Sequence, residues 1–148
     1  MPKKSLKTEV EVNNIQQNKI DTTNLEALVC LIWRNECRNS CDIRIVLTND
    51  VLMSQLNQRY LKKDTLTDVI AFPIEETDDL FEGEIYINVD QVLRNAGIYD
   101  VVPGEELKRI VAHGTLHFAG YGDKTFAEKR KMTEREDCYL AKLFSINQ

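Results

Sequence analysis

The sequence predicts an α+β fold, in which a small mixed sheet packs against helices. Apolar residues alternate in the strand-like segments and recur every three or four positions in the helix-like ones. A helix-like segment separates the first two strand-like segments, which favours a parallel crossover between them. Gly83 and the short link before it favour an antiparallel pair later in the chain. Both kinds of pairing in one sheet make it mixed.

The first part of the chain alternates strands with helices. Polar residues that favour helix N-caps, Asp21 to Asn24 and Asn49 with Asp50, come before the two helix-like segments. The expected elements are strands over 7–15 and 42–48 and helices over 25–38 and from Asn49 to about Tyr60.

The second part begins with two strands and continues with helices. A short apolar strand over 68–72 is expected to stop at Pro73, and an acidic loop leads to a strand over 83–88. A helix from Val89 is expected to end at Gly97. The last two helices are predicted over 104–118, with apolar residues on most sides, and from the capping Thr125 to about Ile146.

Length and composition fit one soluble domain over residues 1–148, and they exclude some classes of protein. No apolar run approaches the ~20 residues of a membrane-spanning helix. The basic start, Met1 to Ser5, is not followed by the apolar stretch of a secretory signal, so a cytoplasmic protein without a membrane partner is expected. The net charge of −5 argues against binding nucleic acid by bulk charge, although a local basic groove stays compatible with it.

The four cysteines are expected to be free thiols. Cys37 and Cys41 have a spacing that occurs in zinc sites, but no second cysteine pair or nearby histidine completes a four-ligand set. Cys30 lies in an apolar helix-like segment, and Cys138 is far along the chain. A chain of this length does not depend on disulfides.

The only two histidines, His113 and His117, lie four residues apart in the predicted helix over 104–118. This spacing puts both imidazoles on one helix face, within reach of one ion at Zn–N distances of about 2.0–2.1 Å. Gly120 favours an end to the helix, and Gly122 eases a turn that brings Asp123 to a third corner. Three protein ligands leave a position for water, which is typical of catalytic zinc sites.

An ordinary structural role is the alternative for this pair, because two histidines four apart also occur by chance. An imidazole without a partner is costly on a largely apolar helix, however, and a glycine stop and a carboxylate follow at a workable distance. The pattern therefore favours a metal site of His113, His117 and Asp123.

This segment resembles the YbeY endoribonucleases, which carry the pattern H-G-x-L-H-x-x-G-Y-D-H with three zinc-binding histidines. The position of the third histidine holds Asp123, an anionic ligand that makes Mn²⁺ or Mg²⁺ more plausible beside Zn²⁺. The residues that match the pattern are His113, Gly114, Leu116, His117, Gly120 and Tyr121.

A second segment resembles the family pattern L-N-x-x-Y-R-x-K-D-x-x-T-D-V-L-S-F-P. Leu61 stands where the family has an arginine, so a group that would stabilise charge is missing. The strand Gly83–Ile87 also resembles the family's G-D-I-x-I. The matching residues are Leu56, Asn57, Tyr60, Lys63, Asp64, Thr67, Asp68, Val69, Phe72 and Pro73.

The resemblance implies a sheet of about four strands with five or six helices and one divalent ion, zinc before manganese or magnesium. It implies a hydrolase that cleaves single-stranded RNA, matures ribosomal RNA and works at the ribosome or its small subunit, including ribosome quality control. His113, Lys63 and Asp68 are the candidate catalytic residues. Lys63 could instead belong to a solvated helix end, and Asp68 could be an ordinary turn residue.

Two other functions compete with this one. A zinc metallopeptidase also has histidines four apart, but it needs a glutamate directly after the first histidine, and Gly114 stands there. A non-catalytic ribosome-associated assembly factor would keep the metal for stability alone. The missing arginine and the missing third histidine favour that alternative.

Overall fold

The computed structural model describes residues 6–61 and 67–146, and the elements in these ranges follow the predicted order. They are β1 (Thr8–Asn14), α1 (Leu25–Glu36), β2 (Ser40–Thr48), α2 (Asp50–Leu56), the π-helical turn η1 (Asn57–Leu61), β3 (Val69–Glu76), β4 (Leu80–Asn88), α3 (Val89–Tyr99), α4 (Pro103–Phe118) and α5 (Phe126–Ile146).

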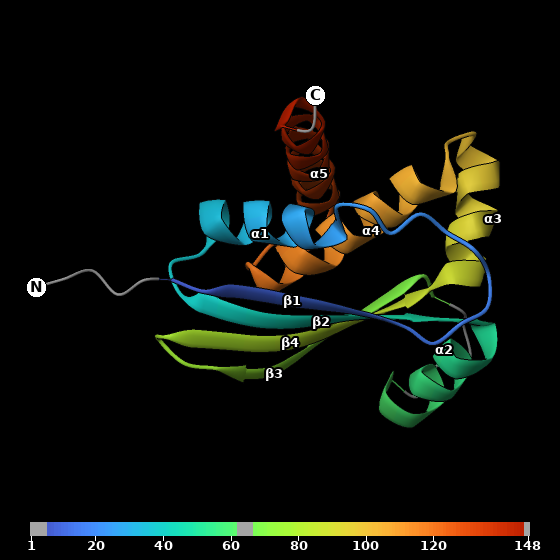
Figure 1. The fold of residues 1–148 in the computed structure, drawn as a ribbon, viewed down its shortest axis with the longest axis horizontal. Coiled ribbons are helices and arrows are strands. Elements are labelled where there is room, and N and C mark those ends of the chain that lie inside the picture. The colour runs from blue at the N-terminus through green and yellow to red at the C-terminus, as the bar shows by residue number, and fades with distance from the viewer. Residues whose placement is uncertain (1–5, 62–66, 147–148) are drawn as a thin grey trace, which may run out of the picture.

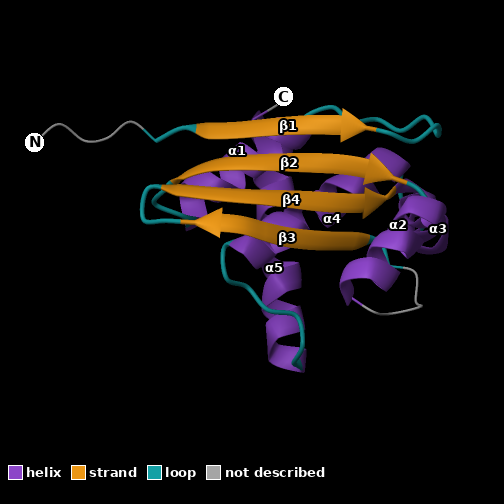
Figure 2. Cartoon of the chain, turned by 90° about the horizontal axis from the view of Figure 1, so that it is seen from below, coloured by secondary structure: helices purple, strands orange, loops and turns teal. Residues whose placement is uncertain are grey.

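The strands form a mixed sheet in the order β1-β2-β4-β3, as Figure 2 shows. β1, β2 and β4 run parallel, and β3 pairs with β4 in the antiparallel direction. The crossover through α1 makes β1 and β2 parallel, whereas the short turn after Glu76 makes β3 and β4 a hairpin. The structure thus confirms the predicted α+β class and the mixed sheet.

Helices α1, α4 and α5 lie on one face of the sheet, and α2 lies on the other, near the ends of β2 and β4 (Figure 1). Ile45 of β2 and Ile85 of β4 face the helices and are completely buried. Gly83 lets the ring of Phe118 approach β4, because a Cβ there would come within 2.8 Å of that ring. This close approach holds the end of α4 on the sheet, next to His117.

Several predicted boundaries are wrong, among them the start of β4, which lies at Leu80 and not at Gly83. β3 continues through Pro73 to Glu76, because an edge strand tolerates a residue without an N–H. α3 continues through Gly97 to Tyr99 and ends where Asp100 takes the left-handed conformation, with φ 54°. The helix after Asn49 changes at Asn57 from α-helix to a π-helical turn.

Two further findings concern the cysteines and the apolar character of the helices. The four cysteines all lie within the described residues and are free thiols, as predicted. In the described ranges, no helix has both the length and the apolar character needed to cross a membrane.

Candidate metal centre

Helix α4 presents both histidines on a partly exposed face. Val111 of the same helix is completely buried, and Gly114 packs so closely on Ile85 that an added Cβ would lie 3.1 Å from it. The rings of His113 and His117 meet edge to face, with 4.6 Å between their centroids. Their Nε2 atoms are 3.0 Å apart, so the two nitrogens face one point.

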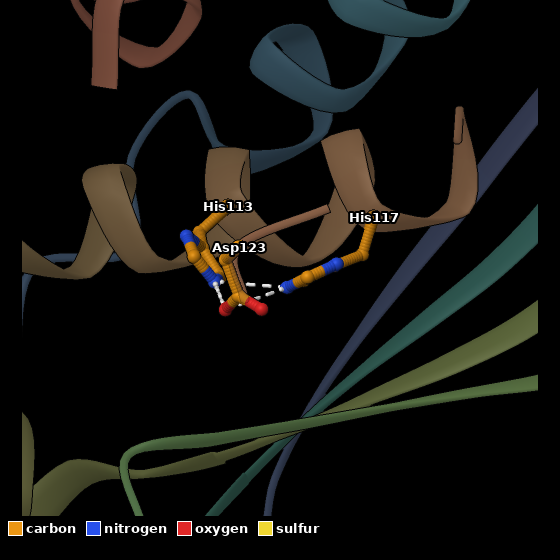
Figure 3. Close-up of side chains that lie close together, drawn as sticks. All are labelled: His113, His117 and Asp123. Atoms are coloured by element: carbon orange, nitrogen blue, oxygen red, sulfur yellow. Dashed lines mark hydrogen bonds and ion pairs between the residues drawn. The ribbon is translucent and has the colours of Figure 1, made fainter. Parts of the chain in front are cut away.

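Asp123 reaches this point from the loop between α4 and α5 (Figure 3). Gly120 has a φ of 105°, which only glycine adopts without strain, and its N–H donates to the carbonyl of His117. The chain therefore reverses direction after α4. The Oδ2 atom of Asp123 lies 3.2 Å from the Nε2 atom of His113 and 3.2 Å from that of His117.

The three atoms fit one divalent ion. Their separations of 3.0, 3.2 and 3.2 Å form a nearly equilateral triangle. A tetrahedral zinc site with bonds of about 2.0–2.1 Å has ligands about 3.3–3.4 Å apart, close to these values. Each residue offers one donor atom, and all three are partly exposed, so a fourth corner is left for a non-protein ligand. The arrangement matches the donor set of a catalytic zinc site.

A buried glutamate that the sequence analysis missed supports His113. Glu136 of α5 has a side chain only 7% exposed, and its Oε2 lies 2.8 Å from Nδ1 of His113. Its Oε1 accepts a hydrogen bond from Arg109 at 3.0 Å, and Arg109 also pairs with Asp137. A carboxylate at Nδ1 keeps the proton there, which leaves the lone pair of Nε2 facing the ion site.

A cavity of about 530 Å³ opens beside His113. Asp68, at the start of β3, lines it together with Glu106 and Asn95. The Asn95 amide donates at 3.4 Å to Asp68 and at 3.5 Å to Glu106, so it joins the two carboxyl groups. Glu136, the residue that supports His113, also lines this cavity.

The charges of the site shift several pKa values. Burial alone would lower the pKa of His113, but the hydrogen bond and charge of Glu136 and the charge of Asp123 raise it. Burial would raise the pKa of Asp123, and the two histidines outweigh this effect and lower it. Burial raises the pKa of Asp68 and of Glu106. The Asp123 carboxyl group is therefore ionised more readily than those of Asp68 and Glu106.

Comparison with known proteins identifies the family. The profile described as Endoribonuclease YbeY matches residues 6–144. The chain belongs to the YbeY endoribonuclease family. A YbeY endoribonuclease of Flavobacterium psychrophilum is 40% identical over 77% of this chain and 80% of its own length. Another, of Chlorobium luteolum, is 35% identical over 92% of this chain and 98% of its own length.

A solved structure supports the fold. The solution structure of TM1509 from Thermotoga maritima has a TM-score of 0.61 and covers 93% of this chain and 89% of its own. Its sequence identity is 24%, so the likeness concerns the architecture alone. The overall fold is thus shared with a solved protein.

The structure brings together the predicted YbeY-type site residues that it describes. His113, His117 and Asp123 converge, as predicted, and Asp68 lines the cavity beside His113. Lys63 lies outside the described residues. Tyr121, for which base stacking and packing were both open, packs against the core.

Glu136 and Arg109 carried signals that the sequence analysis did not use. Glu136 shares the buried face of α5 with Met132, Tyr139 and Leu143, where a charged residue is unusual. Arg109 precedes His113 by one helical turn and so shares the face of the two histidines. These patterns indicate that Glu136 and Arg109 each need a partner, but they do not identify it.

Proposed function

We propose that the chain is a metal-dependent, single-strand-specific endoribonuclease, with residues 1–148 forming one hydrolase domain in the cytoplasm. Its role would be ribosomal RNA maturation and ribosome quality control, with the ribosome or its small subunit as partner. The observation that carries the proposal is the convergence of His113, His117 and Asp123 beside a cavity, in a chain of the YbeY family.

In this function, His113, His117 and Asp123 hold one divalent ion through Nε2, Nε2 and Oδ2. Zinc suits two imidazoles, and the carboxylate also admits manganese or magnesium. Such an ion, when bound, supplies a water of lowered pKa and polarises a phosphoryl oxygen. Glu136 fixes the tautomer of His113 by holding the proton on Nδ1.

Asp68 and Lys63 are the proposed residues of the chain that act beside the ion. Asp68 offers carboxylate oxygens at the cavity next to His113, where they can accept a hydrogen bond from the substrate or from the attacking water. Lys63 would supply positive charge to the phosphate. It would in part replace the arginine of the family pattern, at whose position this chain has Leu61. A lysine does so without the bidentate geometry of a guanidinium.

RNA would reach the site over a local basic rim of Arg59, Lys62, Lys63 and Lys124, despite the net charge of −5. Arg59 of η1 lies over the ring of Tyr60, 5.6 Å from its centroid. A cation beside an aromatic ring offers both charge and a stacking surface to a single strand. Replacing Lys62 and Lys63 together should flatten the dependence of RNA binding on salt by about two units of slope.

The peptidase alternative lacks support at its decisive position. Gly114 is buried against Ile85, so the helix offers no carboxylate directly after His113. The non-catalytic assembly factor differs from the proposed enzyme only in activity, so an activity assay separates the two.

The test compares wild type, His117→Ala and Leu61→Arg on a labelled single-stranded RNA, a duplex of the same sequence and an unstructured peptide. Each protein is assayed with Zn²⁺, with Mn²⁺ and with a chelator. We expect slow cleavage of the single strand by wild type, none by His117→Ala, and a gain of about tenfold for Leu61→Arg. Cleavage that survives His117→Ala would indicate a contaminating nuclease. Metal-loaded wild type that cuts neither polymer would support the assembly factor instead.

A further inference from the structure

Glu36, the last residue of α1, joins three parts of the molecule that are far apart in the sequence. Its Oε1 accepts a hydrogen bond of 2.6 Å from the hydroxyl of Tyr121, in the loop before α5. Its Oε2 accepts a short hydrogen bond from the hydroxyl of Tyr139, in α5. One half-buried carboxylate therefore binds two tyrosines from two different segments.

The Glu36 carboxylate is well suited to hold both hydroxyls. Burial would raise its pKa, but the two tyrosine hydrogen bonds, together with the charges of Arg135 and Lys142, lower it. The group is therefore ionised at neutral pH. Hydroxyls that donate to an ionised carboxylate form shorter and stronger hydrogen bonds than neutral pairs do.

Tyr121 stands two residues before Asp123, and the structure fixes the loop on both sides of that aspartate. Upstream, the backbone N–H of Tyr121 donates to the carbonyl of Leu116, while its side chain is held by Glu36. Downstream, Thr125 and Glu128 exchange two hydrogen bonds of 3.0 Å at the start of α5. Asp123 lies between these anchors, and its side chain is 41% exposed.

Asp123 therefore depends on its backbone for its position. His113 and His117 belong to a helix whose other side is buried, so their Cα atoms are held by the core. Asp123 has no such support from its own element. The Glu36–Tyr121 hydrogen bond is the side-chain contact closest in sequence, on the upstream side, that ties its loop to the body of the protein.

We propose that Glu36 is a positioning residue of the metal centre, which acts through Tyr121 to fix the loop that presents Asp123 and so sets the affinity for the divalent ion. The inference rests on the proposed function, since it takes His113, His117 and Asp123 as the ligands. Glu36 itself touches none of the three donor atoms in the described structure.

The two tyrosines provide a matched pair of variants. Tyr121→Phe and Tyr139→Phe each remove one of the two hydroxyls that donate to Glu36. Only Tyr121 lies in the loop of Asp123. The full chain, stripped of metal, is titrated with Zn²⁺ in competition with a chromophoric chelator. Urea unfolding of the metal-free proteins measures the general loss of stability.

We expect Tyr121→Phe and Glu36→Gln to weaken Zn²⁺ binding by about fivefold to tenfold, below the range for direct partners of a ligand. Tyr139→Phe should change it by less than about twofold, while the metal-free stability of the two tyrosine variants falls by similar amounts. Equal affinity for wild type and Tyr121→Phe, or an equal loss in both tyrosine variants, would overturn the proposal.

A double-mutant cycle gives a readout that a purely structural role would not move. In the Asp123→Ala background, Tyr121→Phe should have no further effect on Zn²⁺ affinity, because the ligand that it positions is gone. A full additional loss would overturn the proposal. His117→Ala separates the two hypotheses: if it binds Zn²⁺ as wild type does, the metal centre itself is wrongly assigned. If His117→Ala loses binding and Tyr121→Phe keeps it, only the role of Glu36 is wrong.

Discussion

The candidate metal centre combines residues from two kinds of structure, a packed helix and an exposed loop. His113 and His117 belong to α4, whose inner side contributes Leu107, Val111 and Leu116 to the core. Asp123 belongs to a loop of short-range turns and hydrogen bonds. The helical spacing brings its two ligands to one face, whereas the loop needs contacts from elsewhere in the fold to place its ligand.

This difference shows where the centre is sensitive to change. The backbone of a helical ligand moves only if α4 moves, and α4 is held by the sheet, α1, α3 and α5. A loop ligand moves when any one of its anchors is lost. Loss of a loop anchor should therefore act mainly on metal affinity, and substitutions under α4 should change both metal affinity and stability.

Removing a helical ligand should have the largest effect. His117→Ala deletes one of the two imidazoles that face the ion site, so Zn²⁺ affinity should fall by about a hundredfold or more, beyond the loss typical of outer partners. Isothermal titration with Zn²⁺ measures this. The metal-free protein should keep its circular dichroism spectrum, because His117 is partly exposed. Retained tight binding would remove His117 from the centre.

Removing the loop ligand should have the next largest effect. Asp123→Ala should lower zinc content more than the loss of any other carboxylate, because Asp123 alone supplies an oxygen to the triangle of donor atoms. Asp123→His should keep or tighten Zn²⁺ binding, since it restores the third histidine of the family pattern. Elemental analysis after dialysis compares the three proteins. Equal zinc in wild type and Asp123→Ala would contradict the assignment.

Loss of the outer support of His113 should have a smaller effect. Glu136→Gln removes the charge that faces Nδ1 and should weaken Zn²⁺ binding by about tenfold. Asp137→Asn is the matched control, because Asp137 also pairs with Arg109 but does not contact His113. It should leave the affinity within about twofold of wild type, since an exposed pair contributes little. Chelator competition measures both, and an equal loss would assign the effect to Arg109.

The smallest effects concern backbone shape and oppose each other in sign. Gly120→Ala places a side chain at φ 105°, which should lower the free energy of unfolding by about 1 kcal/mol or more. Gly97→Ala, in exposed α3 with no atom near the new Cβ, should raise it by about 0.5–1 kcal/mol. Urea unfolding measures both. A neutral Gly120→Ala would show that the turn does not require its left-handed conformation.

The sequence by itself determined the order of the elements and most of the candidate metal centre. Alternation and helical spacing depend on local geometry, so they predicted the parallel crossover, the hairpin and the buried α4. The convergence of His113, His117 and Asp123 could be predicted for the same reason: the two histidines are one helical turn apart, and Gly120 favours an end to the helix before Asp123. Each of these predictions depends only on residues that are close together in the sequence.

The tertiary structure alone decided which distant residues support those ligands. Glu136 comes to His113 from a separate helix, and Glu36 comes to Tyr121 from 85 residues away. Nothing in local periodicity encodes such pairs, because they arise when helices pack on a common sheet. The same reason explains Pro73, which is tolerated because β3 lies at the edge of the sheet. The spacing of side chains along an element can therefore be predicted from the sequence, whereas their tertiary partners depend on how the elements pack.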